Sequence, residues 1–257
     1  MSNFPELFLG NEDVMQVVPV EHKFRDYADL WNAKFQFLEY AAVDREKDLS
    51  VPPARHIIAE LCARAGVKGQ IALRPYFCLT EAEKEKSAWA NGMIAIQSSG
   101  LAGKFPMGNK QWYPERFQEV VNDLKNDFKF VQLGSASDPP LTDAMDLRGK
   151  SKIRETAAVL ANCRIFVGNV GFLMHLARAV ECPSVIVYGG REAPWQSGYS
   201  CNLNLYSAVP CAPCWLWNKC DYNRICMENI TGSNVVSAIE EIIARTKNLL
   251  PIDSLTI

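Results

Sequence analysis

The stretch IFVGNVGFLMHLARAVECPSVIVYGG, residues 165–190, contains the pattern that decides the fold class. It begins with a continuous apolar run at 165–167, continues with a helical pattern over 173–180 and ends with a second apolar run at 184–188. Apolar runs without alternating polar residues are typical of strands that are buried on both faces of a parallel sheet. The stretch therefore predicts a strand–helix–strand unit of an α/β fold.

The same alternation extends toward the N-terminus, back to about residue 93. Short apolar runs at 93–96 and 128–133 predict two further strands, each followed by small and polar residues. Helices are expected from Pro114 and from Ile153, because apolar residues recur there at helical spacing. In an open parallel sheet, ligands bind outside the carboxyl ends of the strands. The loops that follow the strands are therefore the candidate ligand site.

The chain divides into two unequal parts, residues 1–91 and residues 92–257. In the first part, residues 14–20 are a strand candidate. Two helices are also indicated there, one with an apolar face from Ile57 and one that opens with a capping box at Thr80. These elements make up part of a layered domain, so we expect the first part to be an incomplete domain and the second part to be a complete one.

A last helix is expected near the C-terminus. Apolar side chains recur at helical spacing from Val235 to Ile243. Ser233 precedes them and is a candidate N-cap, because a serine hydroxyl accepts a hydrogen bond from the free backbone N–H groups of a first turn.

Composition and charge exclude several classes of protein. The 257 residues include 27 Lys and Arg and 29 Asp and Glu, for a formal net charge of −2, and 48% are hydrophobic. This is the composition of a folded globular protein without an overall field that attracts nucleic acid. No apolar run approaches the roughly 20 residues of a membrane helix, and residues 1–20 lack the features of a secretory signal. We expect a cytoplasmic protein with no transmembrane segment and no nucleic-acid partner.

The candidate ligand site consists of three loops expected at one edge of the sheet. Small residues leave backbone N–H groups open to a ligand, and the N-terminus of the helix after the third loop favours an anion. Any one loop could simply turn the chain, but several at one edge favour a phosphorylated ligand. Lys110 could neutralise the negative charge of such a ligand. The loops contribute Ser98, Ser99, Gly134, Ser135, Gly168, Asn169 and Gly171.

His175 lies in the first turn of the helix that follows the third loop. The positive end of the helix dipole disfavours the charged imidazolium there and favours an anion beside it. Two interpretations remain open for this side chain, a hydrogen-bonded residue of the core and a ligand contact.

The chain has nine cysteines, and four of them form a Cys-x2-Cys-x5-Cys-x5-Cys pattern at Cys211, Cys214, Cys220 and Cys226. Four thiols within one short, loop-rich segment can surround a tetrahedral metal ion such as Zn or Fe. Two disulfides and free packed thiols are the alternatives. The expected cytoplasmic location makes disulfides the weaker of these.

Together these residues resemble glycosyltransferase family 9, the ADP-heptose heptosyltransferases. The Cys-rich loop and the segment at 174–177 most resemble the branch of protein (autotransporter) heptosyltransferases, some of which carry a Cys-bound iron. The matching pieces follow one another in the order of the family, at residues 94–99, 110–117, 131–135, 146–150, 166–169, 174–177 and 211–214.

The resemblance implies a GT-B-like architecture of two Rossmann-like halves, with the donor on the second half and a truncated N-terminal half. It implies an inverting transferase that moves a heptose from ADP-heptose to a hydroxyl group of a bacterial glycan or protein and needs no metal for the transfer. Iron or zinc at the Cys cluster would be structural. Position by position, Ser98, Ser99 and Lys110 would hold the donor diphosphate, Gly168, Asn169, Gly171, Leu173, Met174 and His175 would contact phosphates and sugar, and Leu147 and Arg148 would lie near the base.

Two departures from the family pattern favour an alternative. Val170-Gly171-Phe172 stands where the family has Asp-Ser-Gly. The chain also begins beyond the strand and loop that carry the candidate base of the family, so no catalytic residue is assigned. The alternative is a non-catalytic GT-B-like subunit that binds a nucleotide sugar or serves in assembly. An unpaired edge of an incomplete first sheet would favour a homo-oligomer.

Overall fold

The computed structural model describes residues 5–12, 40–103, 105–245 and 253–257, and the description below concerns these ranges. The strand candidate at 14–20 lies outside them. Within them, no helix combines the length and the apolar character needed to cross a bilayer.

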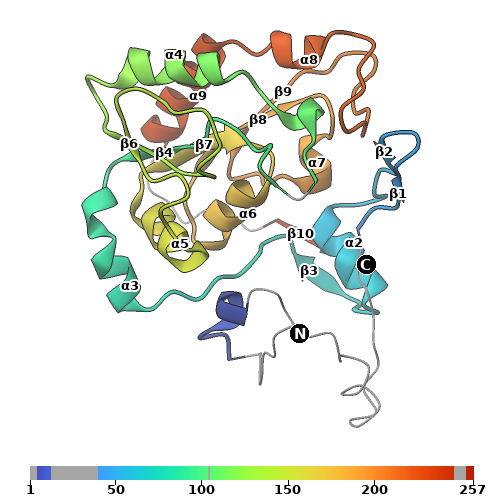
Figure 1. The fold of residues 1–257 in the computed structure, drawn as a ribbon. Helices are drawn as coiled ribbons and strands as arrows, with labels where there is room; N and C mark the ends of the chain where they lie inside the picture. Colours follow the sequence, from blue (N-terminus) through green and yellow to red (C-terminus); the bar gives the residue numbers. More distant parts are fainter. Residues whose placement is uncertain (1–4, 13–39, 104, 246–252) are drawn as a thin grey trace.

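The centre of the molecule is a six-stranded parallel sheet with the order β6-β5-β4-β7-β8-β9 (Figure 1). In chain order this is 3-2-1-4-5-6, the order of a Rossmann-like doubly wound sheet. The direction of winding reverses between β4 and β7, which pair in parallel. The strands are β4 (Ile94–Ile96), β5 (Phe130–Gln132), β6 (Ala144–Asp146), β7 (Ile165–Asn169), β8 (Ser184–Gly189) and β9 (Leu203–Tyr206).

Helices cover both faces of this sheet (Figure 1). One face packs against α4 (Pro114–Leu124) and α9 (Gly232–Ala244), and the other against α5 (Ile153–Asn162) and α6 (Phe172–Ala179). The apolar stripe of α4 is buried in full, as its spacing predicts. Each strand of the centre is buried on both sides, which explains its continuous apolar sequence.

The remaining elements are short. The C-terminal strand β10 pairs antiparallel with β3, so the last residues of the chain lie with the first part rather than with the Rossmann-like sheet. These elements are η1 (Pro5–Phe8), β1 (Val43–Asp44), β2 (Leu49–Ser50), α2 (Ile57–Arg64), β3 (Gln70–Ala72), α3 (Glu81–Lys86), η2 (Ala88–Ala90), η3 (Gly108–Lys110), α7 (Pro194–Ser197), α8 (Ile225–Glu228) and β10 (Ser254–Thr256).

The N-cap predicted for the last helix is wrong by two residues. Helix α9 begins at Gly232 and its N-cap is Thr231, whose hydroxyl accepts a hydrogen bond from the backbone N–H of Asn234 at 3.2 Å. The Asn234 side chain accepts the Thr231 backbone N–H in return, at 3.0 Å. This reciprocal capping box is satisfied only when the helix starts one turn before Asn234.

This correction predicts that Thr231→Ala lowers the free energy of unfolding by about 1 kcal/mol, because the backbone N–H of Asn234 loses its acceptor. Ser233→Ala is the comparison variant, since the exposed Ser233 hydroxyl lies inside the helix and contacts the Thr231 hydroxyl at 2.8 Å but accepts no backbone N–H of the first turn. Its effect should stay within about 0.5 kcal/mol. Urea unfolding of both variants measures the difference, and a larger loss for Ser233→Ala would contradict the assignment.

Candidate functional site

A cavity of about 320 Å³ opens at the carboxyl ends of β4, β5 and β7. This is the place where the winding of the sheet reverses, at which doubly wound folds bind their ligands. The lining residues come from the loops after these strands and from the starts of α5 and α6. They are Gln97, Ser99, Gly100, Ala102, Gly103, Gly134, Ser135, Asp138, Ser151, Ile153, Thr156, Asn169, Val170, Gly171, Phe172 and Leu173.

Two groups that donate to anions meet in this cavity. Helix α6 begins at Phe172, and the N–H groups of its first turn have no partner within the helix. Asn169 is 2% exposed, and its Oδ1 accepts the backbone N–H of Trp112 at 3.1 Å. The Nδ2 group of Asn169 has no hydrogen-bond partner among the described residues. A buried donor without a partner is rare in folded proteins, so this amide is a candidate contact for a ligand oxygen.

The two serines after β4 have different roles. Ser98 is fully buried, and its hydroxyl donates to the Pro139 carbonyl at 2.6 Å and accepts from Gln132 Nε2 at 2.8 Å. Ser99 lines the cavity, and its hydroxyl accepts the backbone N–H of Leu101 at 3.2 Å. The Ser98 side chain is therefore committed to the loop itself, whereas the Ser99 hydroxyl can still donate to a ligand.

Asp138 is a cavity residue that the sequence analysis missed. Its carboxylate accepts the backbone N–H of Ser135 at 3.0 Å, and its side chain is almost completely buried. Burial raises the pKa of Asp138, against the opposing effects of the Ser135 hydrogen bond and of Arg148. Gly134 has a φ of +129°, and a Cβ atom there would collide with the Asp138 carboxylate. The signal in the sequence is a Gly-Ser pair followed three residues later by an aspartate.

Lys110 lies beside the cavity but does not line it. The next residue, Gln111, accepts the backbone N–H of Gly100 at 2.9 Å and donates to the Ser98 carbonyl at 3.0 Å, which joins this segment to the loop after β4. The Lys110 ammonium forms an ion pair with the carboxylate of Glu192, beyond the end of β8. Burial lowers the pKa of Lys110, and the charge of Glu192 opposes this shift.

His175 belongs to the same polar cluster, one turn into α6. Its Nδ1 atom lies 2.6 Å from the hydroxyl of Tyr199. Burial and, to a smaller degree, the charge of Lys110 lower the pKa of His175 to about 4. The imidazole is therefore neutral at pH 7. A neutral ring with one nitrogen held by Tyr199 can still contact a ligand through the other.

The other predicted residues serve the loops and the core. Arg148 binds the Asp146 carboxylate at 2.8 Å and the carbonyl of Asp138, which shapes the loop that ends at the cavity. Leu147 packs against the core, and Met174 is fully buried there. Of the thirteen predicted donor-site residues, the cavity brings together Ser99, Gly134, Ser135, Asn169, Gly171 and Leu173, but not Ser98, Lys110, Leu147, Arg148, Gly168, Met174 or His175.

The four clustered cysteines line a second, smaller cavity of about 50 Å³. Asn109 belongs to the same lining, and its buried Oδ1 atom has no hydrogen-bond partner among the described residues. Burial raises the pKa of Cys214 and of Cys226, and the neighbouring thiols add to both shifts. All nine cysteines are free thiols. No three His, Cys, Asp or Glu side chains in the described ranges are close enough to hold a metal ion as they stand.

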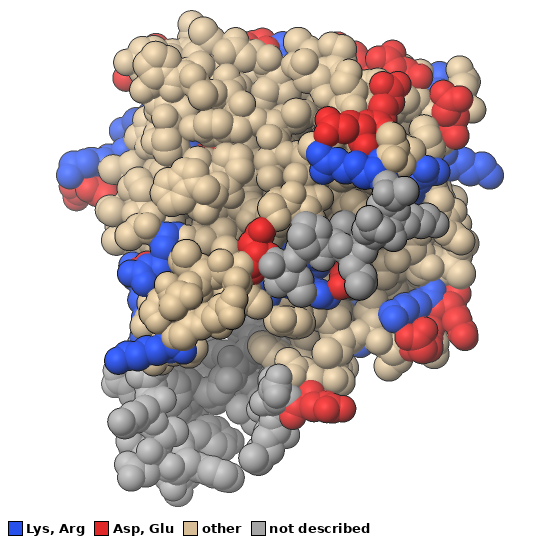
Figure 2. Space-filling model, turned by 180° about the vertical axis from the view of Figure 1, so that it is seen from behind, with Lys and Arg blue, Asp and Glu red and all other residues tan. Residues whose placement is uncertain are grey.

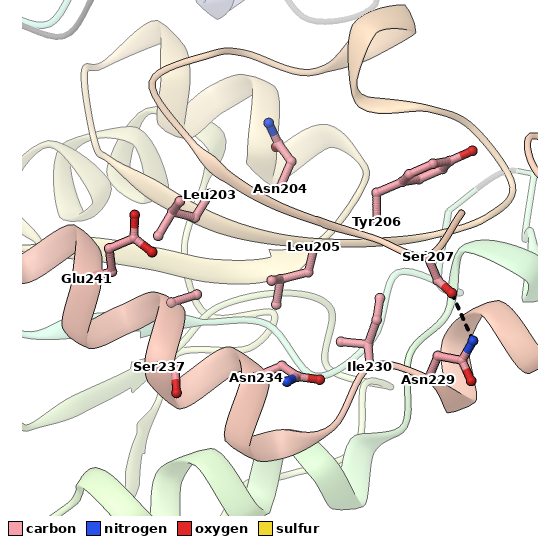
Figure 3. A pocket seen from close by; sticks show the side chains of 11 residues that line it. Leu203, Asn204, Leu205, Tyr206, Ser207, Asn229, Ile230, Asn234, Ser237 and Glu241 are labelled. Atoms are coloured by element: carbon pink, nitrogen blue, oxygen red, sulfur yellow. Dashed lines mark hydrogen bonds between the residues drawn. The ribbon is translucent and has the colours of Figure 1, made fainter. Parts of the chain in front are cut away.

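A third, more open groove of about 410 Å³ lies between the edge strand β9 and helix α9 (Figure 3). Leu205 points toward α9 in this view, whereas Asn204 points to the other side of the strand. The Asn229 side chain donates to the Ser207 hydroxyl at 3.1 Å. The groove lies at the edge of the sheet, away from the reversal point between β4 and β7, so it is not the candidate site.

The comparisons with known proteins agree with this geometry. The model of glycosyltransferase family 9 (heptosyltransferase) matches residues 40–216, more than half of the chain. The chain belongs to glycosyltransferase family 9. The match includes the loops after β4, β5, β7 and β8 and reaches the first two cysteines of the cluster. No curated protein matches the chain.

Three solved structures have a similar fold. The glycosyltransferase of family 9 from Veillonella parvula DSM 2008 has a TM-score of 0.56 and 16% identity. The match covers 75% of this chain and 61% of the Veillonella protein. The E. coli ADP-heptose lps heptosyltransferase II has a TM-score of 0.51 and 18% identity, with coverages of 68% and 55%. The iron-containing dodecameric glycosyltransferase TibC from enterotoxigenic E. coli H10407 has a TM-score of 0.51 and 20% identity, with coverages of 59% and 45%. The chain thus spans about half of the length of these proteins.

The burial of His175 predicts a pH effect on stability. The unfolded chain takes up a proton on this residue near pH 6.5, whereas the folded protein does so only near pH 4, so stability falls as the pH drops between these values. We expect His175→Gln to reduce the loss of unfolding free energy between pH 7 and pH 5, measured by urea unfolding. Tyr199→Phe is the control, because it keeps the buried imidazole and should keep the slope. An unchanged slope in His175→Gln would contradict the assignment.

Proposed function

We propose that the chain is a glycosyltransferase that binds a nucleotide-diphosphate sugar, with ADP-heptose as the expected donor, in the cavity at the ends of β4, β5 and β7. The observation that carries this proposal is the buried Asn169 amide, which has no partner among the described residues and belongs to a residue that lines the same cavity as the N-terminus of α6. The amide and the helix N-terminus both donate hydrogen bonds to anions. They lie at one edge of the parallel sheet, and the chain belongs to family 9.

The polar groups of the cavity suit the parts of such a donor. The diphosphate would lie against the first turn of α6 and Asn169, with Ser99 within reach. The Asp138 carboxylate would accept hydrogen bonds from sugar hydroxyls, as a carboxylate does in many nucleotide sites. None of the residues that the structure shows lining the cavity is basic. Lys110 and His175, which lie in the polar cluster beside the cavity, would meet the outer phosphate from the side.

The transfer would proceed with inversion. The acceptor hydroxyl, on a bacterial glycan or protein, attacks the anomeric carbon while the bond from this carbon to the diphosphate oxygen breaks. The hydroxyl proton passes to a base that we do not assign. The N–H groups at the start of α6 and the ammonium of Lys110 would stabilise the charge that develops on the leaving diphosphate. A cytoplasmic location and a homo-oligomer are parts of the same proposal.

One observation favours the alternative of a subunit that binds a nucleotide sugar without transferring it. Lys110 is paired with Glu192 rather than directed into the cavity. A carboxylate beside the diphosphate would weaken the stabilisation of the leaving group. Release of ADP from ADP-heptose in the presence of acceptor glycans separates the two functions, because the subunit binds the donor but leaves it intact.

The charge balance of the surface limits the choice of partners. On the face shown in Figure 2, basic and acidic side chains lie near one another, and neither sign covers the centre of the face. With a formal net charge of −2, the chain offers no overall attraction to a polyanion. We therefore expect phosphate groups to be bound by the cavity and not by the electrostatic field of the surface.

The central test replaces Asn169 by its isostere. Asn169→Asp keeps the oxygen that accepts the Trp112 backbone N–H but removes the free donor and adds a negative charge. We expect the affinity for ADP to fall at least about tenfold, as for the loss of a hydrogen bond to a charged group. Burying a carboxylate also lowers the melting temperature, so the titration is run on protein that circular dichroism shows to be folded. Calorimetric titration with ADP, with UDP and GDP as controls, measures this. Wild-type affinity in Asn169→Asp would place the ligand elsewhere.

We also propose that the Cys cluster binds a structural metal ion, iron or zinc. Thiolates are suitable donors for both, and all four cysteines line a single small cavity. The thiols would have to draw together around the ion, because they do not form a ready ligand set as they stand. The bound ion would cross-link the loop and supply no step of the transfer.

Metal analysis of the purified protein tests this second proposal. We expect about one equivalent of iron or zinc in the wild type, and none, together with a lower melting temperature, in Cys211→Ser/Cys214→Ser. Cys163→Ser/Cys182→Ser is the control, since these two thiols are buried in the core away from the cluster and should not affect the metal content. A metal-free wild type would contradict the proposal.

A further inference from the structure

The turn that carries Lys110 is held by the Cys-rich loop. Lys110 ends the short 3-10 turn η3, and Asn109 in its middle is only 5% exposed. The backbone N–H of Asn109 donates to the Trp217 carbonyl at 2.9 Å. Its side-chain Nδ2 donates to the carbonyl of Lys219 at 2.8 Å and to that of Leu216 at 3.3 Å. One buried residue thus makes three contacts with a single loop.

The first residue of the turn is tied to the same loop. The backbone N–H of Gly108 donates to Asn218 Oδ1 at 2.8 Å, and its carbonyl accepts from the Arg224 guanidinium at 2.9 Å. A Cβ atom at Gly108 would lie 3.3 Å from Asn218 Oδ1, so the close approach favours glycine there. The position of the turn is therefore set by contacts with residues 216–224.

The loop also holds the residues before Glu192, the ion-pair partner of Lys110. The backbone N–H groups of Cys214 and Trp215 donate to the carbonyls of Gly190 and Arg191, at 3.1 and 2.8 Å. The Arg191 guanidinium donates to the carbonyl of Leu216 at 3.1 Å. The Lys110 and Glu192 side chains are 20% and 4% exposed. Both partners of this largely buried pair are thus fixed by one loop.

The far side of the loop is clamped by the hairpin of β1 and β2. The Asp48 carboxylate accepts the backbone N–H groups of Asn218 and Lys219, at 2.6 and 2.7 Å. The backbone N–H of Trp217 donates to the Asp48 carbonyl at 2.8 Å. These hydrogen bonds hold the loop in place on the side that faces away from η3.

We propose that Asn109 is a positioning residue that sets the direction of the Lys110 side chain and so links the Cys-rich loop to the phosphate end of the donor site. The step to the donor rests on the proposed function, whereas the link from Asn109 to Lys110 does not. In Asn109→Ala, η3 loses both side-chain contacts with the loop, and the Lys110 ammonium moves away from Glu192 into solvent. Asn109 also lines the Cys cavity, so this residue contacts both the loop and the space between the four thiols.

Acetylation of lysines by acetic anhydride, read by peptide mass spectrometry, tests the link without any nucleotide. We expect the labelling rate of Lys110 to rise about fivefold in Asn109→Ala, while that of Lys125, the C-cap of α4, is unchanged. Asn162→Ala is the matched control, because the Asn162 side chain also donates to two carbonyls, those of Lys84 and Ala158, at 2.9 Å each. Asn218→Ala, at an exposed position, serves as a second variant and should raise the Lys110 rate in the same direction.

Two outcomes of the labelling would overturn the proposal. One is a wild-type Lys110 rate in both Asn109→Ala and Asn218→Ala. The other is an equal rise in Asn162→Ala, which would show a general loosening of the fold.

A double-mutant cycle on ADP affinity tests the link to the donor site. We expect Asn109→Ala alone to weaken ADP binding severalfold. Added to Lys110→Ala, it should cause no further loss of ADP affinity. Independent, additive losses would show that Asn109 does not act through Lys110. If Lys110→Ala itself leaves the ADP affinity unchanged, the proposed place of Lys110 at the diphosphate is wrong, and the labelling experiment still decides whether Asn109 positions Lys110.

Discussion

The site depends on one hydrogen bond, from the backbone N–H of Trp112 to the side-chain oxygen of Asn169. The Trp112 ring is fully buried, and its indole N–H donates to the Ile230 carbonyl at 3.0 Å, next to the start of α9. The hydrogen bond thus fastens the segment after β4 to the end of β7, across the reversal point of the sheet. It also fixes the orientation of the Asn169 amide, which belongs to a cavity-lining residue and whose N–H groups have no partner among the described residues. A change that frees Trp112 would therefore disturb the loop, the amide and the Lys110 turn together.

The described region has two polar centres of opposite character. The cavity is lined by hydroxyl groups, amides and one carboxylate without a basic side chain, so it meets a phosphate with dipoles and backbone N–H groups. Beside it, Glu192 forms nearly buried ion pairs with both Lys110 and Arg191. In the proposed complex, the Lys110 ammonium would reach the diphosphate from its place beside Glu192. Breaking a buried pair is costly, so the loop that holds both partners influences how far Lys110 can turn toward a ligand.

The central part of the fold could be predicted because burial on both faces leaves a continuous apolar run in the sequence. All four predicted strands of the second part and the helices between them are present. The edge strands β6 and β9 were missed because they are short and only half buried, which removes that signal. The order of the strands was out of reach, since it depends on contacts between distant segments. The loops were predicted as ligand-binding, but the distinction between Ser98 and Ser99 follows from one carbonyl, that of Pro139, which no local pattern reveals.

The most direct test of the account is a crystal structure of the protein with ADP. The account predicts a phosphate oxygen within hydrogen-bond distance of Asn169 Nδ2 and of the first backbone N–H groups of α6, with a ribose hydroxyl near the Asp138 carboxylate. Phosphates bound away from α6, with the Asn169 amide still unpartnered, would contradict it.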